Sequence, residues 1–508
     1  MKGFTENERR NVIPRWRTFD ETAKLGELEP SARQLQESLH STSHDPLAQA
    51  KADWEKHRTI GHAADLVGAG IFLERSHEVQ EAIEFLRYRE SQTSIWVKEL
   101  LEQFSSESED DVSTIEPASI QQRAIRRVQN LRPLLRDEPK DPITQVDIAH
   151  AFYTLGNSES ASEHMIVAQQ LAPNNRFVLR SASCLWTNME EYDRAYDALI
   201  RSDGAKSDPW LMSAEIAVGN ELGKSPQSIK RALNLINDEN LLDFHRSELA
   251  SAVATVDWNH GSERRAKRLF DRSLKDPTEN SLAQAVSVLS QDASFSLSED
   301  LWDRPRVFEA KAQDAYLNED WEHAVEHCLQ WQADQPFSSG AGISGSFISS
   351  AALDDFELSK QFAQTGLVAN PDNFSLLNNL AFSLINLNEF SAAEKYLSRI
   401  NLSRISGVEH DVARILKSAT TGLLHYRQGD VLAGRRNYLD ARRLAGNLQA
   451  GFSNLEARAT AFHAIEEAPH LSPNDHQIID EAIDLLIRER DPACGFLLSK
   501  LRAIRDNK

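Results

Sequence analysis

The chain has few cysteines, and none of them lies in a metal-binding pattern. Of 508 residues only three are cysteines, and they are far apart: Cys184, Cys328 and Cys494. No Cys-x2-Cys or mixed Cys/His spacing indicates zinc. We interpret each cysteine as a small hydrophobe that fills a helix interface in a reducing compartment.

Basic residues are also in deficit. The chain carries 56 Lys and Arg against 77 Asp and Glu, a formal net charge of -21. Contacts from Lys and Arg to phosphates supply most of the affinity of proteins for nucleic acid. We therefore expect no direct binding of nucleic acid, and instead protein partners that carry basic patches.

Long apolar runs are missing as well. Residues 1–19 contain no apolar segment of the kind found in secretory signals. The most apolar stretch, Ala63–Leu73, includes Asp65 and is too short to span a bilayer. We expect a cytoplasmic protein without membrane association.

What the chain does contain is a repeated pair of helices, clearest in Pro142–Asn175. This stretch predicts two antiparallel helices joined by a tight turn at residues 155–157. Pro173 ends the second helix, because proline lacks an N–H and disfavours helix in the residue before it. Small residues fall where the two helices touch: Ala149, Ala161 and Ala168.

The same pattern recurs about every 34 residues, the sign of a solenoid. The second helix of each unit starts at a residue suited to capping the first N–H groups or the positive end of a helix. These cap positions are Asn157, Glu191, Ser262, Asp320, Asp355, Glu389 and Asp430. Four residues later every position is small: Ala161, Ala195, Ala266, Ala324, Ser359, Ala393 and Gly434.

This pattern resembles the tetratricopeptide repeat (TPR), over most of residues 142–448. The resemblance implies an all-α, TPR-like helical-hairpin solenoid, a right-handed superhelix, with a helical N-terminal region and C-terminal capping helices. One departure is Phe347, where a small residue is expected; it indicates a one-residue phase slip near residues 352–353. The disturbed spans 210–243 and 281–304 indicate that the superhelix changes curvature or opens there.

The predicted organisation divides the chain into six segments. They are an N-terminal helical region with one degenerate repeat (1–104), an acidic linker (105–117), a first array (118–280), an irregular break (281–304), a second array (305–448) and a helical cap (449–508). Residues 1–50 are expected to form partial helices or an arm that orders on a partner. The Arg-rich helix at 118–137 is either a solvated face or a docking site for acidic segments.

TPR proteins are generally interaction scaffolds, and their first helices line a concave groove for an extended peptide or a partner helix. Carried over by repeat position, the predicted partner-binding groove contains His150, Tyr153, Arg180, Asn188, Gln313, Tyr316, Asn378, Asn379 and Asn386, with Val146, Cys184, Glu309 and Phe382 beside them. The carboxylate clamp of chaperone-binding TPRs does not fit, because only Asn379 matches it.

Signals for catalysis are weak. Gly340–Ser346 has neither a GxxxxGK[ST] nor a GxSxG pattern. The pairs His40/His44 and His323/His327 lack a clear third metal ligand. We interpret the nine tryptophans as core or groove residues. We predict no catalytic residue, cofactor or metal site, and no enzymatic activity.

The sequences of the second and third repeats, APNNRFVLRSAS and SDPWLMSAEIA, resemble those of bacterial TPR proteins. The sequence thus predicts a non-catalytic scaffold or adaptor in a bacterial multi-protein assembly, with defence or stress systems as one setting. The alternative is a peptide-binding sensor whose superhelix changes curvature when a ligand binds.

Overall fold

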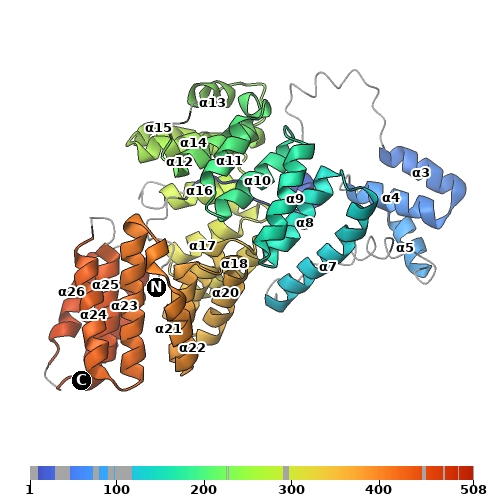
Figure 1. The fold of residues 1–508 in the computed structure, drawn as a ribbon. Coiled ribbons are helices and arrows are strands. Elements are labelled where there is room, and N and C mark those ends of the chain that lie inside the picture. Colours follow the sequence, from blue (N-terminus) through green and yellow to red (C-terminus); the bar gives the residue numbers. More distant parts are fainter. Residues whose placement is uncertain are drawn as a thin grey trace. The chain divides into compact units, whose positions relative to one another are not determined.

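The computed structural model describes residues 10–28, 46–72, 79–89, 97, 117–224, 226, 228–289, 297–448, 453–472, 475–489 and 491–506. The chain forms two compact units, one made of Met1–Phe19 with Ile115–Lys508 and the other of Asp20–Thr114. Every regular element in the described ranges is a helix, as predicted (Figure 1). None of these helices is both long and apolar enough to cross a membrane.

The described part of the smaller unit packs helices around a core of its own. Its helices are α3 (Pro46–His57), α4 (Ile60–Phe72) and α5 (Gln80–Tyr88), and α1 (Phe19–Lys24) begins at its boundary. Gly70 and Ala82 lie at close contacts in this unit: Ala82 is fully buried, and a Cβ on Gly70 would come 2.7 Å from Val79. Residues 91–104, apart from Val97, lie outside the described residues.

The larger unit is a series of antiparallel hairpins that follows α7 (Pro117–Asp137), and it confirms the prediction of a TPR-like solenoid (Figure 1). The hairpins are α8 (Pro142–Thr154) with α9 (Ser158–Leu171), α10 (Arg176–Asn188) with α11 (Tyr192–Ile200), α12 (Pro209–Glu221) with α13 (Ile229–Ile236), α14 (Asp243–Asn259) with α15 (Glu263–Ser273), α17 (Phe308–Leu317) with α18 (Trp321–Asp334), α19 (Ser339–Ala351) with α20 (Phe356–Ala369), α21 (Phe374–Asn386) with α22 (Phe390–Arg399), and α23 (Gly407–Arg427) with α24 (Val431–Gly446).

Between the two sets of hairpins stands α16 (Glu279–Leu289), followed by the 3-10 helix η5 (Glu299–Asp303). After the last hairpin come α25 (Ser453–Glu467), α26 (Gln477–Arg488) and α27 (Pro492–Asp506), which share a core around Ile479 and Leu497. The C-terminal helices also return to the array, since the Tyr316 hydroxyl donates to Asp491 at 2.7 Å.

The turn inside most hairpins has one geometry, and it explains the predicted cap positions. The residue before the cap takes a left-handed conformation, with φ of 77° at Gly156 and 61° at Glu190. The cap N–H then bonds back across the turn, as from Asn157 to the Phe152 carbonyl at 2.9 Å. All seven predicted positions are N-caps, and the side chains of Asn157, Asp320, Asp355 and Asp430 accept a backbone N–H.

The small positions are confirmed as helix contacts, because each of them is buried between the two helices of its hairpin. The predicted phase slip is confirmed too. The α19–α20 turn has one residue more than the turns of most other hairpins, and the Asp355 N–H reaches back six residues to Ser349 O instead of five. The extra residue moves Ser346 into the position that is small in the other repeats, where the Ser359 hydroxyl donates to its carbonyl, and Phe347 is buried next to that position.

The array also contacts itself over a long sequence separation, because α20 packs against both α7 and α8. The α8–α9 turn lies directly on α20: a Cβ on Gly156 would come 2.4 Å from the Val368 carbonyl oxygen. Glycine is thus required at position 156 for two reasons, the positive φ of the turn and the close approach of α20.

The predicted segment boundaries stay predictions. The acidic linker at 105–117 lies outside the described residues except for Pro117, and so do His40 and His44. On the Arg-rich helix α7, Arg127 pairs with Asp147 at 2.8 Å and Arg132 lies over the Phe152 ring, while Arg123, Arg126 and Arg136 are exposed.

Candidate binding site on the inner surface

Residues 10–19, called the N-terminal arm below, lie against several helices of the array. Residues 10–18 form no helix, and Pro14 favours an extended conformation at Ile13. Its partners come from α8, α12, α16, α17 and α18, elements that are far apart in the sequence. The inner surface of the array, predicted as a groove for a peptide, thus holds a peptide segment of the same chain.

Two arginines of the arm bind one buried carboxylate. Arg10 forms a fork on Glu309, with Nε to Oε1 at 2.8 Å and Nη2 to Oε2 at 3.0 Å. Arg15 pairs with the same carboxylate. Burial opposes ionisation of Glu309, but Arg10 and Arg15 outweigh it and lower its pKa to about 2. Glu309 is therefore a carboxylate held ionised by two arm residues.

Amide side chains of α16 hold both the arginine and the backbone of the arm. Asn280 and Gln284 accept from the Arg10 guanidinium at 2.8 and 2.7 Å. The same two amides donate to arm carbonyls, Asn280 to Ile13 O at 3.0 Å and Gln284 to Arg10 O at 2.7 Å. Bonds of this kind recognise an extended main chain whatever its side chains.

A second acidic position holds Arg17, whose side chain is 2% exposed. Its guanidinium reaches Glu279 at 2.7 Å and Asp334 at 2.7 Å, so it joins α16 to α18. Burial alone would raise the pKa of Asp334, but Arg17 and Arg306 hold that pKa below its usual range. The site therefore presents three carboxylates, Glu279, Glu309 and Asp334, to the arginines of the arm.

Trp16 points away from these carboxylates into an aromatic box. Its ring lies 5.2 Å from His150, 5.5 Å from Phe337 and 6.0 Å from Tyr153, and it is fully buried. Neighbouring residues of an extended chain face opposite sides. Arg15 and Arg17 therefore contact carboxylates on one side, while Trp16 contacts aromatic rings on the other.

The arm ends against the first hairpins. The Phe19 N–H donates to Asp147 Oδ1 at 3.0 Å, and the Phe19 ring meets Phe177 edge to face at 5.3 Å. Behind the arm, Arg180 pairs with Glu248 at 3.1 Å and lies over the Trp210 ring. Burial raises the pKa of Glu248, although Arg180 opposes this shift.

The predicted groove residues fall into two groups. His150 and Tyr153 contact the arm through Trp16, and Gln313 donates to Glu309 at 3.3 Å. The others are tied to the array itself: Arg180 to Glu248, Asn188 to Cys184, Tyr316 to Asp491, Asn379 to Ser346 and Asn386 to Phe382 O. Asn378 is fully buried, and its amide has no hydrogen-bond partner within the described part of the chain. Their role in partner binding stays a prediction.

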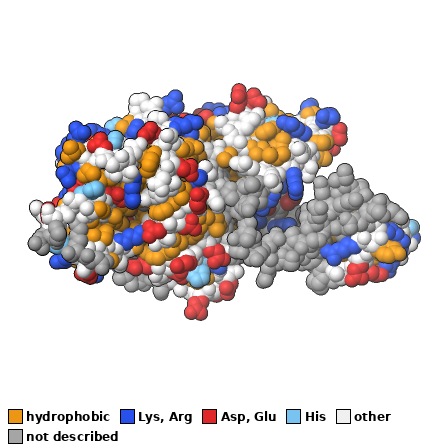
Figure 2. All heavy atoms as spheres, turned by 90° about the horizontal axis from the view of Figure 1, so that it is seen from below, with side chains coloured by type: hydrophobic (Ala, Val, Ile, Leu, Met, Phe, Trp, Pro, Cys, Tyr) orange, Lys and Arg blue, Asp and Glu red, His pale blue; other side chains and the backbone are white. Residues whose placement is uncertain are grey.

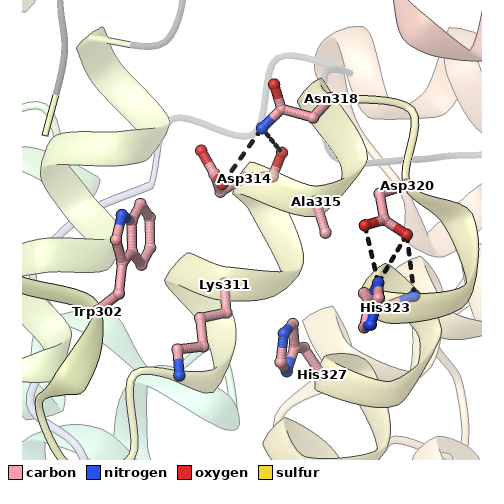
Figure 3. A pocket seen from close by; sticks show the side chains of 8 residues that line it. All are labelled: Trp302, Lys311, Asp314, Ala315, Asn318, Asp320, His323 and His327. Atoms are coloured by element: carbon pink, nitrogen blue, oxygen red, sulfur yellow. Dashed lines mark hydrogen bonds and ion pairs between the residues drawn. The ribbon is translucent and has the colours of Figure 1, made fainter. Parts of the chain in front are cut away.

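A separate shallow pocket contains the His323/His327 pair that the sequence singled out (Figure 3). His323 Nδ1 lies 2.8 Å from Asp320, and His327 Nδ1 lies 3.0 Å from Gln330. The Asp320 carboxylate raises the pKa of His323. Lys311 also lines the pocket (Figure 3). Within the described residues no group of three His, Cys, Asp or Glu could hold a metal ion.

Residues 1–50 are expected to form partial helices or an arm that orders on a partner. Residues 10–18 do form an arm, but it is ordered on the array of its own chain, which the sequence reasoning did not anticipate. A signal was present, because Arg15-Trp16-Arg17 interleaves an aromatic residue with basic ones in a strongly acidic chain. The aromatic box also needs Phe337, which lies outside the predicted groove positions.

On the face that Figure 2 shows, acidic and basic side chains are interspersed with hydrophobic ones over the described atoms. At the arm, three carboxylates face arginines and an aromatic box holds Trp16.

No family model and no curated protein matches the chain. Similar solved structures include yeast Tom70 (13% identity, TM-score 0.31, covering 76% of this chain and 96% of that one). Others are human IFIT1 with PPP-AAAA (10%, 0.33, 91% and 95%) and the Cut9–Hcn1 hetero-tetramer of APC/C (13%, 0.28, 79% and 95%). The chain has a TPR-like fold, as its own hairpins, caps and small contact positions define it.

Proposed function

We propose that this chain is a non-catalytic scaffold or adaptor that binds an extended segment of a partner protein on its inner surface. The observation that carries the proposal is the N-terminal arm: the inner surface already holds an extended segment through its backbone, its arginines and its tryptophan. Following the resemblance to bacterial repeat proteins, we place it in a cytoplasmic bacterial assembly, with a defence or stress system as one setting.

The charge of the surface supports a protein partner over nucleic acid. Glu279, Glu309 and Asp334 face the arm, and the whole chain carries a net charge of -21. A phosphate backbone would be repelled by these carboxylates, whereas guanidinium groups match their geometry.

Affinity purification from the native host tests the proposal. The tagged full-length chain should recover a partner, and Glu309→Gln should reduce the recovery, since basic residues of the partner segment then lose the buried carboxylate that Arg10 and Arg15 occupy in the arm. Glu394→Gln is the matched control, because it removes the same charge at an exposed position, where Glu394 accepts a hydrogen bond from Gln428. Recovery of the chain alone, or turnover of a substrate by the purified chain, would overturn the proposal.

A second candidate, a sensor that changes curvature, is favoured by the span of the arm. Through Trp16 and Arg17 the arm links α8 to α18, and α8 also packs on α20. Loss of the arm would remove one of the ties across the array. Small-angle scattering with and without a bound partner segment tests this: an unchanged radius of gyration on saturation argues against the sensor.

A further inference from the structure

We propose that the partner segment recognised on the inner surface has the side-chain pattern of the arm, an arginine followed after four residues by Arg-aromatic-Arg, and that it binds by replacing residues 10–19. The inference rests on the proposed function, and it adds the chemistry and the route of binding. The four positions that define the pattern in the arm are Arg10, Arg15, Trp16 and Arg17.

The surface requires a cationic occupant. With the arm in place, Arg10 and Arg15 face Glu309, and Arg17 faces Glu279 and Asp334. Glu309 and Asp334 are among the least exposed carboxylates of the chain, with side chains 9% and 6% exposed. Without an occupant only Asp334 would keep a described arginine, Arg306. Buried carboxylates without cations are unfavourable, so departure of the arm favours entry of another basic segment.

The geometry also selects an order of residues, not charge alone. Arg15 and Arg17 reach the acidic side, while Trp16 enters the box of His150, Tyr153 and Phe337 on the other. An extended segment meets both sides only if basic and aromatic residues alternate. The amides of Asn280 and Gln284 bind the main chain of the occupant and so add no sequence requirement of their own.

The arm itself is held in a way that permits exchange. Its backbone takes part in no helix over residues 10–18, and its described backbone bonds to the array run to side chains, namely those of Asn280, Gln284 and Asp147. Because it is tethered to the array, the arm competes at a high effective concentration. A partner segment therefore binds more readily when the arm is weakened.

The test uses a fluorescein-labelled peptide of residues 10–19 as probe and the full-length chain as host, with binding followed by fluorescence anisotropy. The host variant Trp16→Ala weakens the internal competitor and should bind the peptide at least tenfold tighter than the unaltered chain. A peptide with all three arginines changed to glutamine should bind at least 100-fold more weakly. A scrambled peptide of equal charge should bind at least tenfold more weakly.

Equal binding of the scrambled peptide would overturn the pattern, and equal binding by both hosts would overturn the replacement. Should Trp16→Ala fail to fold, hydrogen exchange of the unaltered chain decides: excess peptide should speed exchange in residues 10–19, and an unchanged rate overturns the proposal. Dimers of the unaltered chain in sedimentation, lost on Trp16→Ala, would show that the occupant is a second copy and also overturn it.

The outcomes separate this inference from the proposed function. If the peptide does not bind but Glu309→Gln still reduces partner recovery, the proposal of a scaffold is supported and the proposal of an arm-like partner segment is rejected. If the peptide binds with the stated selectivity but no partner is recovered from the native host, the proposed recognition of the arm-like pattern is supported and the proposal of a scaffold is rejected.

Discussion

Trp16→Ala is the substitution that best separates a docked arm from a permanent part of the core. Trp16 is fully buried, and its ring contacts His150, Tyr153 and Phe337, which belong to two distant parts of the array. Outside these contacts the arm is held by ion pairs, by hydrogen bonds to the amide side chains of Asn280 and Gln284, and by the smaller apolar contacts of Val12 and Phe19. Removing the indole should therefore release the arm while the hairpins keep their own cores.

The size of the effect follows from the burial of the side chain. Truncation of a buried aromatic residue to alanine costs about 3–5 kcal/mol. If this cost falls on docking of the arm, the equilibrium between docked and released arm shifts by a factor of about 10²–10³ or more. The Phe19 amide reports on it directly, because its N–H is bonded to Asp147 Oδ1 at 3.0 Å only when the arm is docked.

Hydrogen exchange read by mass spectrometry measures this shift at residues 10–19. Trp16→Phe is the matched control: it keeps an aromatic ring in the box and removes an indole N–H that has no hydrogen-bond partner within the described ranges. We expect a loss below about 1.5 kcal/mol for Phe. The reasoning is refuted if Trp16→Ala speeds exchange equally in α8, α16 and α18, or if it leaves residues 10–19 as protected as before.

Three further predictions concern the array. Gly156→Ala and Gly261→Ala each place a side chain at a positive φ, 77° and 75°, and should each lose about 1 kcal/mol of stability. Gly156→Ala should lose a further ~1–3 kcal/mol because its Cβ would contact Val368 O, whereas a Cβ on Gly261 has no atom within 4 Å; equal shifts in urea unfolding would contradict the contact. Burial would raise the pKa of Glu309, but Arg10 and Arg15 lower it from 4.5 to about 2. Ionised Glu309 therefore contributes about 3 kcal/mol to the stability of the fold, which is fully present above pH 5 and is lost as the pH falls towards 2. A stability difference between the unaltered chain and Glu309→Gln that does not change with pH would count against this prediction. Burial, and after it the nearby arginines, lower the pKa of His463 from 6.5 to about 4. Because the unfolded chain then takes up a proton that the folded chain does not, stability present above pH 6.5 is lost as the pH falls to about 4. His463→Gln should flatten the dependence of the melting temperature on pH between 7 and 4, and an unchanged slope would refute this assignment.

Much of the fold could be predicted from local sequence signals. The cap residues, such as Asn157 and Asp320, act on N–H groups three residues away, and the small residues, such as Ala161, act within one hairpin. Even the one-residue slip before Asp355 was visible, because a hairpin of fixed period leaves a large residue out of phase when its turn is lengthened. Signals of this kind need only the helix period and the turn chemistry of one repeat.

The candidate site could be predicted only in part. The repeat positions placed His150, Tyr153 and Glu309 on the inner surface, and all three contact the arm. The same positions in the second array gave Asn379 and Tyr316, which the structure buries against Ser346 and Asp491. Repeat phase assigns a residue to a face, but neighbouring elements decide whether that face is open.

The sequence by itself thus determined the repeat: the helices, their caps, the close contacts within each hairpin and the acidic character of the chain. Only the tertiary structure decided what occupies the inner surface. Arg10 and Glu309 are 299 residues apart, and no local spacing relates them. They meet because successive hairpins bring α8, α16 and α18 around one extended segment, and such a contact depends on the summed geometry of every repeat between them.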